Sequence, residues 1–430
     1  MQTQLTPDIL SSEQGQEAEA ILRNCVHCGF CTATCPTYQL LGSELDSPRG
    51  RIYQVKQMLE GASPSVAVQQ HLDRCLLCRA CETTCPSGVD YSRLLEIGRQ
   101  HLHQRQSRTL PDRSVRWLLR KVIPRSDLFA ALLNLGRLFK PLLPANMSRL
   151  IPKKVSIGES DWPPVRHQRK MLILDGCVQP ALAPNINLAT AQVLDRLGIS
   201  LITTPKAGCC GAVEHHLDDH EASRQAARRN IDQWLPLLQD QAEALVITAS
   251  GCSQMVKDYD KLLADDPQYA EKARELASRC KDIAEIIQQE DIEPLKQSMS
   301  PPPRIAFHAS CTLQHGQQIS GVVETILSRI GYQLTPVAEG HLCCGSAGTY
   351  SILQPELSNQ LGERKTEALM KGQPELIATA NIGCLSHISK TAPDSTPVVH
   401  WIELLSPGQL QALTGKSATV KQVICHNHQL

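Results

Sequence analysis

The sequence lacks a net charge, a long apolar run and a basic, apolar leader segment. Its 43 basic and 43 acidic residues cancel, so overall charge does not favour a nucleic-acid partner. No stretch approaches the run of about 18 apolar residues that crosses a bilayer. The start, from Met1 to Asp8, lacks the features of a secretory signal peptide. We therefore expect a soluble or peripheral protein in a reducing compartment.

A nucleotide-binding fingerprint is also absent. No Gly-x-Gly-x-x-Gly opens the strand and helix repeats described below, so a flavin or dinucleotide that accepts a hydride is expected on another polypeptide. Cysteine, in contrast, is plentiful, with 18 residues in a chain of 430. In a reducing compartment these thiols are free to bind metal. The length predicts about three domains, and the 42% hydrophobic content supplies their cores.

Two copies of one cysteine pattern occupy the first quarter of the chain. Each reads Cys-x2-Cys-x2-Cys-x3-Cys-Pro, the spacing that holds [4Fe-4S] clusters in bacterial two-cluster ferredoxins. Zinc ligands are usually spaced as two separated pairs, so structural zinc is the weaker alternative. In two-cluster ferredoxins the fourth thiolate binds the other cluster. The predicted ligands are Cys25, Cys28, Cys31 and Cys85 for one cluster and Cys75, Cys78, Cys81 and Cys35 for the other.

Helical segments are predicted around these motifs. Apolar residues recur at helical spacing from Ile52 to Leu59, and a further helix is expected from Tyr91 to His103. Residues 1–15 are polar and are expected to be loose. We therefore predict a mostly helical, ferredoxin-like domain over residues 15–105. Arg49 and Arg51, between the motifs, are interpreted either as neighbours of the anionic clusters or as a solvated first helical turn.

Residues 106–167 form a region rich in Arg, Leu and Pro, predicted to be a basic helical linker. Basic amphipathic helices of this type lie on anionic membranes or dock on a partner subunit. The alternative is an interdomain linker whose apolar face packs on its own protein. Between Arg113 and Lys154 the single acid is Asp127, and the basic residues are Arg113, Arg116, Arg120, Lys121, Arg125, Arg137, Lys140, Arg149, Lys153 and Lys154.

From residue 168 the sequence alternates short apolar strands with helices, and this pattern occurs twice. Cys177 matches Cys311, Cys209-Cys210-Gly211 matches Cys343-Cys344-Gly345, and Cys252 matches Cys384. Alternating strands and helices imply right-handed crossovers and a mainly parallel sheet in each half. The predicted class is therefore a multidomain α+β and α/β protein. Its duplicated α/β domains are expected over residues 168–300 and 301–410.

Each duplicated half has four cysteines at predicted strand ends. Ligands of open α/β sheets bind at the carboxyl ends of the strands, so these thiols are expected to converge into a further redox or cluster site. Glycine after the vicinal pair would allow a sharp turn beside a bulky group. The alternative reading, small buried hydrophobic residues, is disfavoured by the repeat. The thiols are Cys177, Cys209, Cys210, Cys252, Cys311, Cys343, Cys344 and Cys384.

Four histidines lie near these cysteines in the sequence, and Cys280 has no counterpart in the repeat. Lone histidines near a site are more often neighbours of the ligands or surface groups. We therefore do not assign His215, His216, His308 or His341 as ligands. No catalytic residue is assigned either.

The duplicated halves resemble the CCG (cysteine-rich) domain family, which occurs in heterodisulfide reductases and in iron-sulfur subunits of flavin-dependent dehydrogenases. With the ferredoxin-like module, the chain is similar to glycolate oxidase (glycolate dehydrogenase) iron-sulfur subunits. This resemblance rests on Cys25-Val-His-Cys-Gly-Phe-Cys31, Ser47-Pro-Arg-Gly-Arg51, His71-Leu-Asp-Arg-Cys75 and the segment from Cys81 to Tyr91.

The resemblance implies a complex at the cytoplasmic side of the bacterial inner membrane. An FAD-containing subunit would oxidise glycolate to glyoxylate, a further subunit would complete the complex, and a quinone or other membrane acceptor would take the electrons. The alternatives are the equivalent subunit of an L-lactate or glycerol-3-phosphate dehydrogenase, a disulfide reductase of the heterodisulfide reductase type, and a redox-sensing scaffold.

The sequence departs from the heterodisulfide reductase pattern in one respect. Reductases that hold a non-cubane cluster end each half with Cys-x2-Cys, but the earlier position here is Ala249 in one half and Asn381 in the other. Each half is one thiol short. A further cluster in the CCG domains is therefore left open, and an electron-transfer role is favoured over disulfide reduction.

Overall fold

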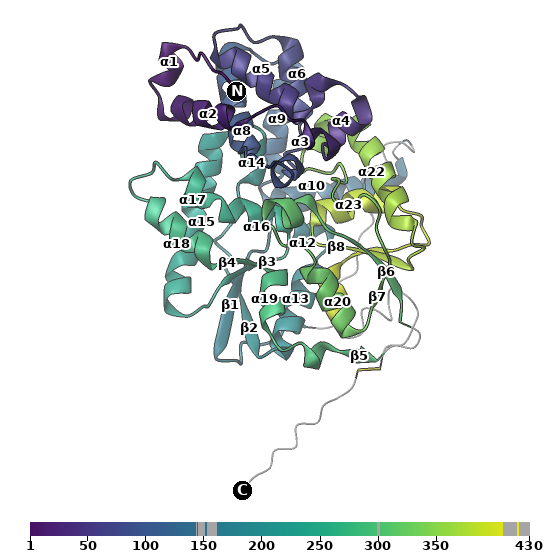
Figure 1. Ribbon diagram of the computed structural model, residues 1–430. Helices are drawn as coiled ribbons and strands as arrows, with labels where there is room; N and C mark the ends of the chain where they lie inside the picture. The colour runs from purple at the N-terminus through teal and green to yellow at the C-terminus, as the bar shows by residue number, and fades with distance from the viewer. Residues whose placement is uncertain (143, 145–150, 153–160, 299–301, 407–418, 421–430) are drawn as a thin grey trace.

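The computed structural model describes residues 1–142, 144, 151–152, 161–298, 302–406 and 419–420. A helical domain that contains both ferredoxin-type motifs, here called the cluster domain, lies at one end of the molecule. Two α/β halves lie side by side below it in Figure 1, with the first half in teal and the second in green and yellow. Among the described residues, no helix is both long and apolar enough to cross a membrane.

The cluster domain is built almost entirely from short helices. Ser47 begins its central helix by accepting a hydrogen bond from the Gly50 amide. That helix packs closely on the last one, because a Cβ at Gly98 would lie only 2.5 Å from Cγ2 of Val55. The elements are α1 (Pro7–Leu10), α2 (Glu13–Asn24), α3 (Phe30–Ala33), α4 (Pro36–Leu41), η1 (Glu44–Asp46), α5 (Pro48–Leu59), α6 (Val66–Asp73), α7 (Ala80–Thr83) and α8 (Tyr91–Arg105).

The N-terminal residues are ordered against this domain, so the expectation that residues 1–15 are loose is wrong. The Thr6 amide donates to the Leu59 carbonyl at 3.1 Å, and the amino group of Met1 donates to the Cys25 carbonyl at 2.9 Å. Leu5 is only 6% exposed. A few apolar side chains in a polar stretch are enough to hold the segment on the core.

The described part of the basic region contains α9 (Leu110–Val122), α10 (Ser126–Phe139) and η2 (Lys140–Leu142). Part of its positive charge is neutralised within the protein. Buried Arg116 pairs with Asp112 at 3.0 Å and with Asp73 at 3.4 Å, and Arg120 pairs with Asp219 at 2.8 Å. Three of the basic residues, Arg149, Lys153 and Lys154, lie outside the described residues.

The first α/β half has a parallel sheet of four strands in the order β2-β1-β3-β4. The strands are β1 (Arg169–Ile173), β2 (Ile199–Thr203), β3 (Leu245–Ile247) and β4 (Cys280–Asp282). Its helices are α12 (Gln179–Leu182), α13 (Asn185–Arg196), α14 (Ala212–His216), α15 (His220–Asp240), α16 (Ser250–Lys257), α17 (Tyr259–Leu262), α18 (Ala270–Arg279) and α19 (Ile283–Gln289), followed by η3 (Glu293–Leu295).

The second half repeats this topology with the strand order β7-β6-β8-β9, again all parallel. Its strands are β6 (Arg304–His308), β7 (Gln333–Leu334), β8 (Leu376–Thr379) and β9 (Val398–His400). The other elements are η4 (Thr312–Gly316), α20 (Val322–Ile330), α21 (Tyr350–Leu353), α22 (Pro355–Met370), α23 (Ile382–Thr391) and η5 (Trp401–Leu405). A separate pair, β5 (Gln297–Ser298) and β10 (Thr419–Val420), is antiparallel. The predicted fold class is confirmed.

One apolar core runs through both halves. It includes Ile173 and Val246 from the first sheet, Ile305 and Ala378 from the second, and the fully buried Trp401. A hydrogen bond from the Ser250 amide to the Ala380 carbonyl, at 3.2 Å, also crosses the boundary. The two halves therefore form a continuous platform under the cluster domain.

Candidate metal centres

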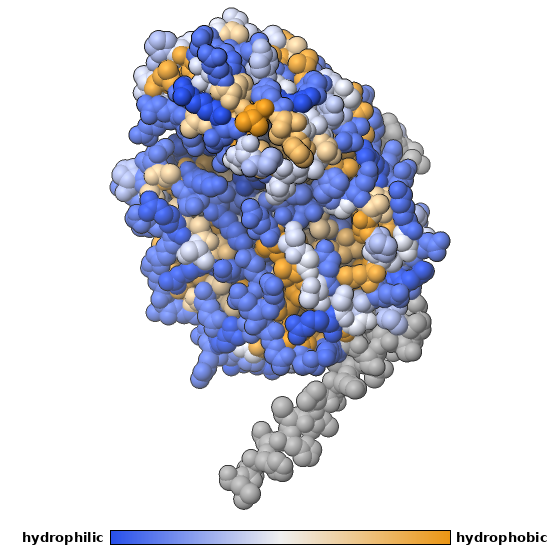
Figure 2. All heavy atoms as spheres, viewed as in Figure 1, coloured by the Kyte–Doolittle hydropathy of each residue, from blue (hydrophilic) through white to orange (hydrophobic). Residues whose placement is uncertain are grey.

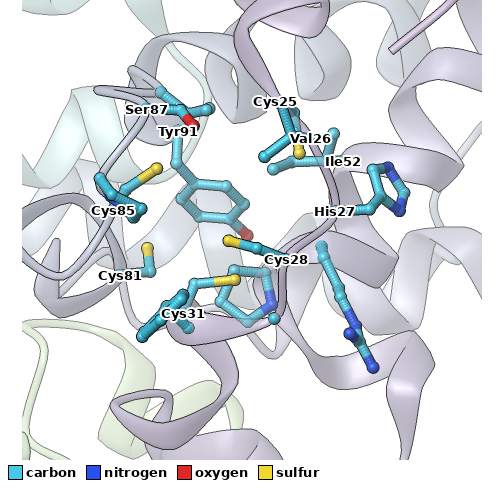
Figure 3. Close-up of a pocket in the computed structure, with 16 residues that line it drawn as sticks. Cys25, Val26, His27, Cys28, Cys31, Ile52, Cys81, Cys85, Ser87 and Tyr91 are labelled. Carbon is cyan, nitrogen blue, oxygen red and sulfur yellow. The ribbon is translucent and has the colours of Figure 1, made fainter.

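Four of the predicted ligands surround a hollow in the cluster domain. Cys25 follows α2, Cys28 lies in the loop after it, and Cys31 lies in α3. Cys85 comes from the second motif. Figure 3 shows their sulfur atoms, and that of Cys81, directed toward a shared space beside the Tyr91 ring. The hollow measures about 430 Å³, including its opening to solvent.

The other four predicted ligands line a second hollow of about 370 Å³. Cys75, Cys78 and Cys81 come from the second motif, and Cys35 comes from the first. Cys81 lines both hollows, whereas Cys85 lines only the first of these two and Cys35 only the second. The cysteines are thus grouped in the two crossed sets that the spacing predicts, while ligation itself stays a prediction.

The two ligand loops share an unusual backbone. His27 (φ 56°) and Gly29 (φ 87°) of the first loop are left-handed, and Leu77 (φ 54°) and Arg79 (φ 58°) stand at the matching positions of the second. Residues other than glycine adopt this region rarely, and such strain concentrates at functional sites. The loops turn sharply enough to direct three thiols inward from one short segment.

A buried ionic network supports the second hollow. Arg51, 1% exposed, donates to Thr37 Oγ1 at 3.1 Å and to the His71 carbonyl at 2.8 Å. Asp46 contacts Arg51, the His71 ring and Arg74. Arg51 lines the second hollow and is not solvated, whereas Arg49 lines the first hollow and pairs with Glu44 at 2.7 Å.

The donor set fits iron-sulfur clusters. Burial raises the pKa of Cys31 to about 11 and raises the pKa of Cys78 and of Cys81 well above the usual range. Thiolates are therefore unstable in these hollows unless positive charge is present, as it is in a metal cluster. Eight converging thiols with cationic Arg51 nearby suit two such groups.

Cysteines of the α/β halves lie at the carboxyl ends of the strands. In the first half Cys177 follows β1, Cys209 and Cys210 follow β2, and Cys252 lies in the first turn of α16. Cys177 adjoins Cys209, and Cys210 adjoins both Cys209 and Cys252. The structure therefore brings all four thiols of this half together.

The second half gathers its four thiols in the same way. Cys311 lies 3.8 Å from Cys343, sulfur to sulfur, and Cys344 contacts both Cys343 and Cys384. Hydrogen bonding to Cys343 and burial raise the pKa of Cys311 well above its usual range. The thiols of each half form what is here called a thiol quartet.

Glycine after each vicinal pair permits the sharp turn. Gly211 (φ 87°) and Gly345 (φ 89°) are both left-handed. Their carbonyls accept hydrogen bonds from two serines at matching places in the following long helices, Ser223 at 3.1 Å and Ser358 at 2.8 Å. The repeat therefore extends from the sequence to the bonds that hold each turn.

The second quartet has a histidine neighbour that we did not assign. His308, at the end of β6, has a ring nitrogen within 4.8 Å of the Cys344 and Cys384 sulfurs, while its Nδ1 contacts Thr379 Oγ1 at 2.9 Å. The sequence signal for this neighbour was the position of His308 at the end of a predicted strand. The matching position of the first half is Leu174. Asn381 instead caps α23 and donates to Ser250 Oγ at 3.2 Å.

The second quartet also adjoins the cluster domain. Cys78 packs in one apolar cluster with Cys311 and Cys343, together with Leu76 and Tyr350. Cys280, in contrast, is buried in β4 and belongs to the core of the first half. The second hollow and the second quartet thus border the same apolar cluster.

Two cysteine-lined hollows above a duplicated, parallel α/β platform define the class of the protein. It is an iron-sulfur protein that combines a dicluster module with paired cysteine-rich domains. The family models agree: residues 21–89 match the 4Fe-4S dicluster domain, and residues 171–257 and 305–389 match the cysteine-rich domain.

Full-length relatives narrow this class. The chain is 50% identical over 405 residues to the glycolate oxidase iron-sulfur subunit of Escherichia coli (strain K12), covering 94% of this chain and 98% of that protein. It is 30% identical over 394 residues to the probable glycolate oxidase iron-sulfur subunit of Bacillus subtilis (strain 168), covering 85% and 88%. The chain belongs to the family of glycolate oxidase iron-sulfur subunits.

Other similarities cover a smaller part of the chain or show only the fold. Lactate utilization protein A of Exiguobacterium sp. is 27% identical over 240 residues, which is 55% of this chain and 96% of that protein. A crystal structure of a hypothetical protein from Helicobacter pylori aligns with a TM-score of 0.55 at 10% identity, covering 96% of this chain and 76% of that one.

Proposed function

We propose that this chain is the electron-transfer subunit of a glycolate-oxidising complex. A flavin-bearing partner would oxidise glycolate to glyoxylate, and this chain would deliver the electrons toward a quinone or another membrane acceptor. The main support is the grouping of eight cysteines into two hollows in a chain that is similar, over nearly its whole length, to a glycolate oxidase iron-sulfur subunit.

The chemistry requires two kinds of subunit. Oxidation of glycolate removes two electrons and two protons, which a flavin accepts together, and the sequence contains no nucleotide fingerprint of its own. When bound, a [4Fe-4S] cluster accepts and releases single electrons. In this chain the residues that would hold the clusters are Cys25, Cys28, Cys31 and Cys85, and Cys75, Cys78, Cys81 and Cys35.

The flavoprotein is proposed to dock over the first hollow. Cys28 is exposed there, and the adjoining side chains Val26 and Phe30 are 66% and 61% exposed. Apolar side chains lie on the surface over this part of the cluster domain (Figure 2). The second hollow instead faces the second quartet. Electrons would therefore enter at the first hollow and leave through the second half.

A further contact is proposed along α9 and α10. Both helices expose large apolar side chains, including Trp117, Leu118, Leu135, Leu138 and Phe139. Because Arg116 and Arg120 are paired internally, the remaining positive charge is smaller than the sequence count indicated. We propose that this surface binds an anionic membrane mainly through apolar contact, with exposed Arg113 and Lys121 adding an attraction that salt weakens.

Vesicle sedimentation tests the membrane contact. Leu135→Glu combined with Leu138→Glu should abolish binding to anionic vesicles, because the charges oppose burial in the lipid headgroup layer. Arg113→Glu combined with Lys121→Glu should weaken it only at low salt. Unchanged binding of the leucine variant would exclude this surface.

Gene deletion tests the function. Loss of this chain should abolish glycolate-dependent dye or quinone reduction in cell extracts and leave lactate-dependent reduction intact. Loss of lactate-dependent reduction alone would favour the lactate alternative, which is consistent with the similarity to lactate utilization protein A. Disulfide reductase activity of the isolated chain would overturn both readings.

A further inference from the structure

A cluster of two histidines and a glutamate lies between the cluster domain and the first half, outside both thiol quartets. Glu96 projects from α8, His215 from α14 and His220 from the start of α15. One oxygen or nitrogen of each side chain lies within 4.8 Å of the other two. The two imidazole rings meet edge to face, with centroids 5.2 Å apart.

Three of the four nitrogens of these rings are buried without a hydrogen-bond partner among the described residues. Nδ1 of His215 and both ring nitrogens of His220 make no hydrogen bond to the described residues. His220 Nδ1 lies 3.6 Å from Glu96 Oε1, too far for a hydrogen bond. Most buried polar atoms do have such partners. Arg93 contacts the other carboxylate oxygen, Oε2, at 3.0 Å, which leaves Oε1 on the histidine side.

Two imidazoles and one carboxylate form a donor set typical of Zn²⁺ and of non-haem Fe²⁺. Zinc bonds of about 2.0–2.2 Å place ligand atoms roughly 3.3 Å apart, so the three groups need only a small closing movement. We propose that Glu96, His215 and His220 bind one divalent transition-metal ion. The ion would tie α8 of the cluster domain to α14 and α15 of the first half.

Zinc is the probe for this site. The full-length, cluster-loaded protein is treated anaerobically with a chelator that leaves its iron content unchanged, and is then loaded with Zn²⁺. We expect one added zinc per chain by elemental analysis. X-ray absorption should show nitrogen and oxygen neighbours at about 2.0–2.2 Å and no sulfur at about 2.3 Å. Sulfur neighbours would place the metal on the quartets and overturn the proposal.

Variants make the test specific. Glu96→Gln keeps the size of the side chain, and His220→Ala removes a ring; each should weaken zinc binding by about tenfold or more. The control is His167→Ala, because His167 pairs with Asp195 at 2.9 Å elsewhere in the first half, and it should retain the zinc. Unchanged iron content establishes that a variant folds. If His220→Ala loses iron, Glu96→Gln is the deciding variant. Full zinc retention by Glu96→Gln would contradict the proposal.

Discussion

The two α/β halves share one topology but contact the cluster domain differently. The second half meets it through an apolar cluster in which Cys78 packs with Cys311 and Cys343. The first half meets it through polar pairs, such as Arg79 with Asp258 at 3.0 Å and His103 with Asp218 at 2.7 Å. Duplication preserved the sheets and the turns, whereas the surroundings of the two quartets diverged.

This difference bears on the electron path proposed above. Thiols of both domains border one apolar cluster at the second half, which supports the proposed passage of electrons from the second hollow into this half. The second quartet also has His308 and the buried Lys365 nearby, whereas the matched positions of the first half are the apolar Leu174 and the neutral Asn230. The polar boundary of the first half is better suited to hold the domains together.

The largest expected effect comes from breaking the second hollow. Cys35→Ser removes a thiol that comes from the first motif, so the cluster held by Cys75, Cys78 and Cys81 should be lost, with about half of the iron. Cys85→Ser should damage the other cluster. Iron analysis and EPR measure both changes, and Cys280→Ser is the control because that thiol lies in the core of the first half.

The crossed assignment has a clear contradicting result. If the EPR spectrum of Cys35→Ser matched that of Cys25→Ser rather than that of Cys75→Ser, each motif would hold its own cluster. The same variant tests the comparison of the halves. Alkylation should become faster at Cys311 and Cys343, which pack against Cys78, and stay unchanged at Cys177 and Cys209.

A smaller effect should separate the two glycine turns. An alanine at Gly211 or Gly345 should lower the free energy of unfolding by roughly 1–2 kcal/mol, because its backbone must be left-handed. At Gly345 the new Cβ would also lie 2.7 Å from the Ser358 carbonyl oxygen and from Leu361 Cβ, whereas at Gly211 the nearest atoms are 3.2 Å away. Overpacking adds about 1–3 kcal/mol. Urea unfolding should therefore show a greater loss for Gly345→Ala, and equal losses would mean that the second turn relaxes freely.

The sequence predicts what is local and repeated. Spacing within each motif identified the thiols that now line the hollows, and strand ends identified the quartets, because neighbouring positions along the chain determine both. The N-terminal segment was misjudged because Leu5 is isolated among polar residues. The pairing of Arg116 with Asp73, the contact of Cys78 with Cys311 and the approach of Glu96 to His220 depend on long-range packing, for which the sequence contains no periodic signal.

The smallest expected effects concern single bonds across the two domain boundaries. Asp258→Asn removes the ion pair with Arg79, in which both side chains are 23% exposed, so the loss in unfolding free energy should be at most about 1 kcal/mol. Tyr350→Phe removes the hydrogen bond from the Tyr350 hydroxyl to the Arg74 carbonyl, 3.2 Å long, at the apolar boundary. That bond should contribute roughly 0.5–1.5 kcal/mol.

Salt distinguishes the two contacts. In 0.5 M NaCl the effect of Asp258→Asn should become smaller, because the ions screen a partly exposed pair, whereas the effect of Tyr350→Phe should stay unchanged. An equal salt response in both variants would contradict the contrast between a polar and an apolar boundary.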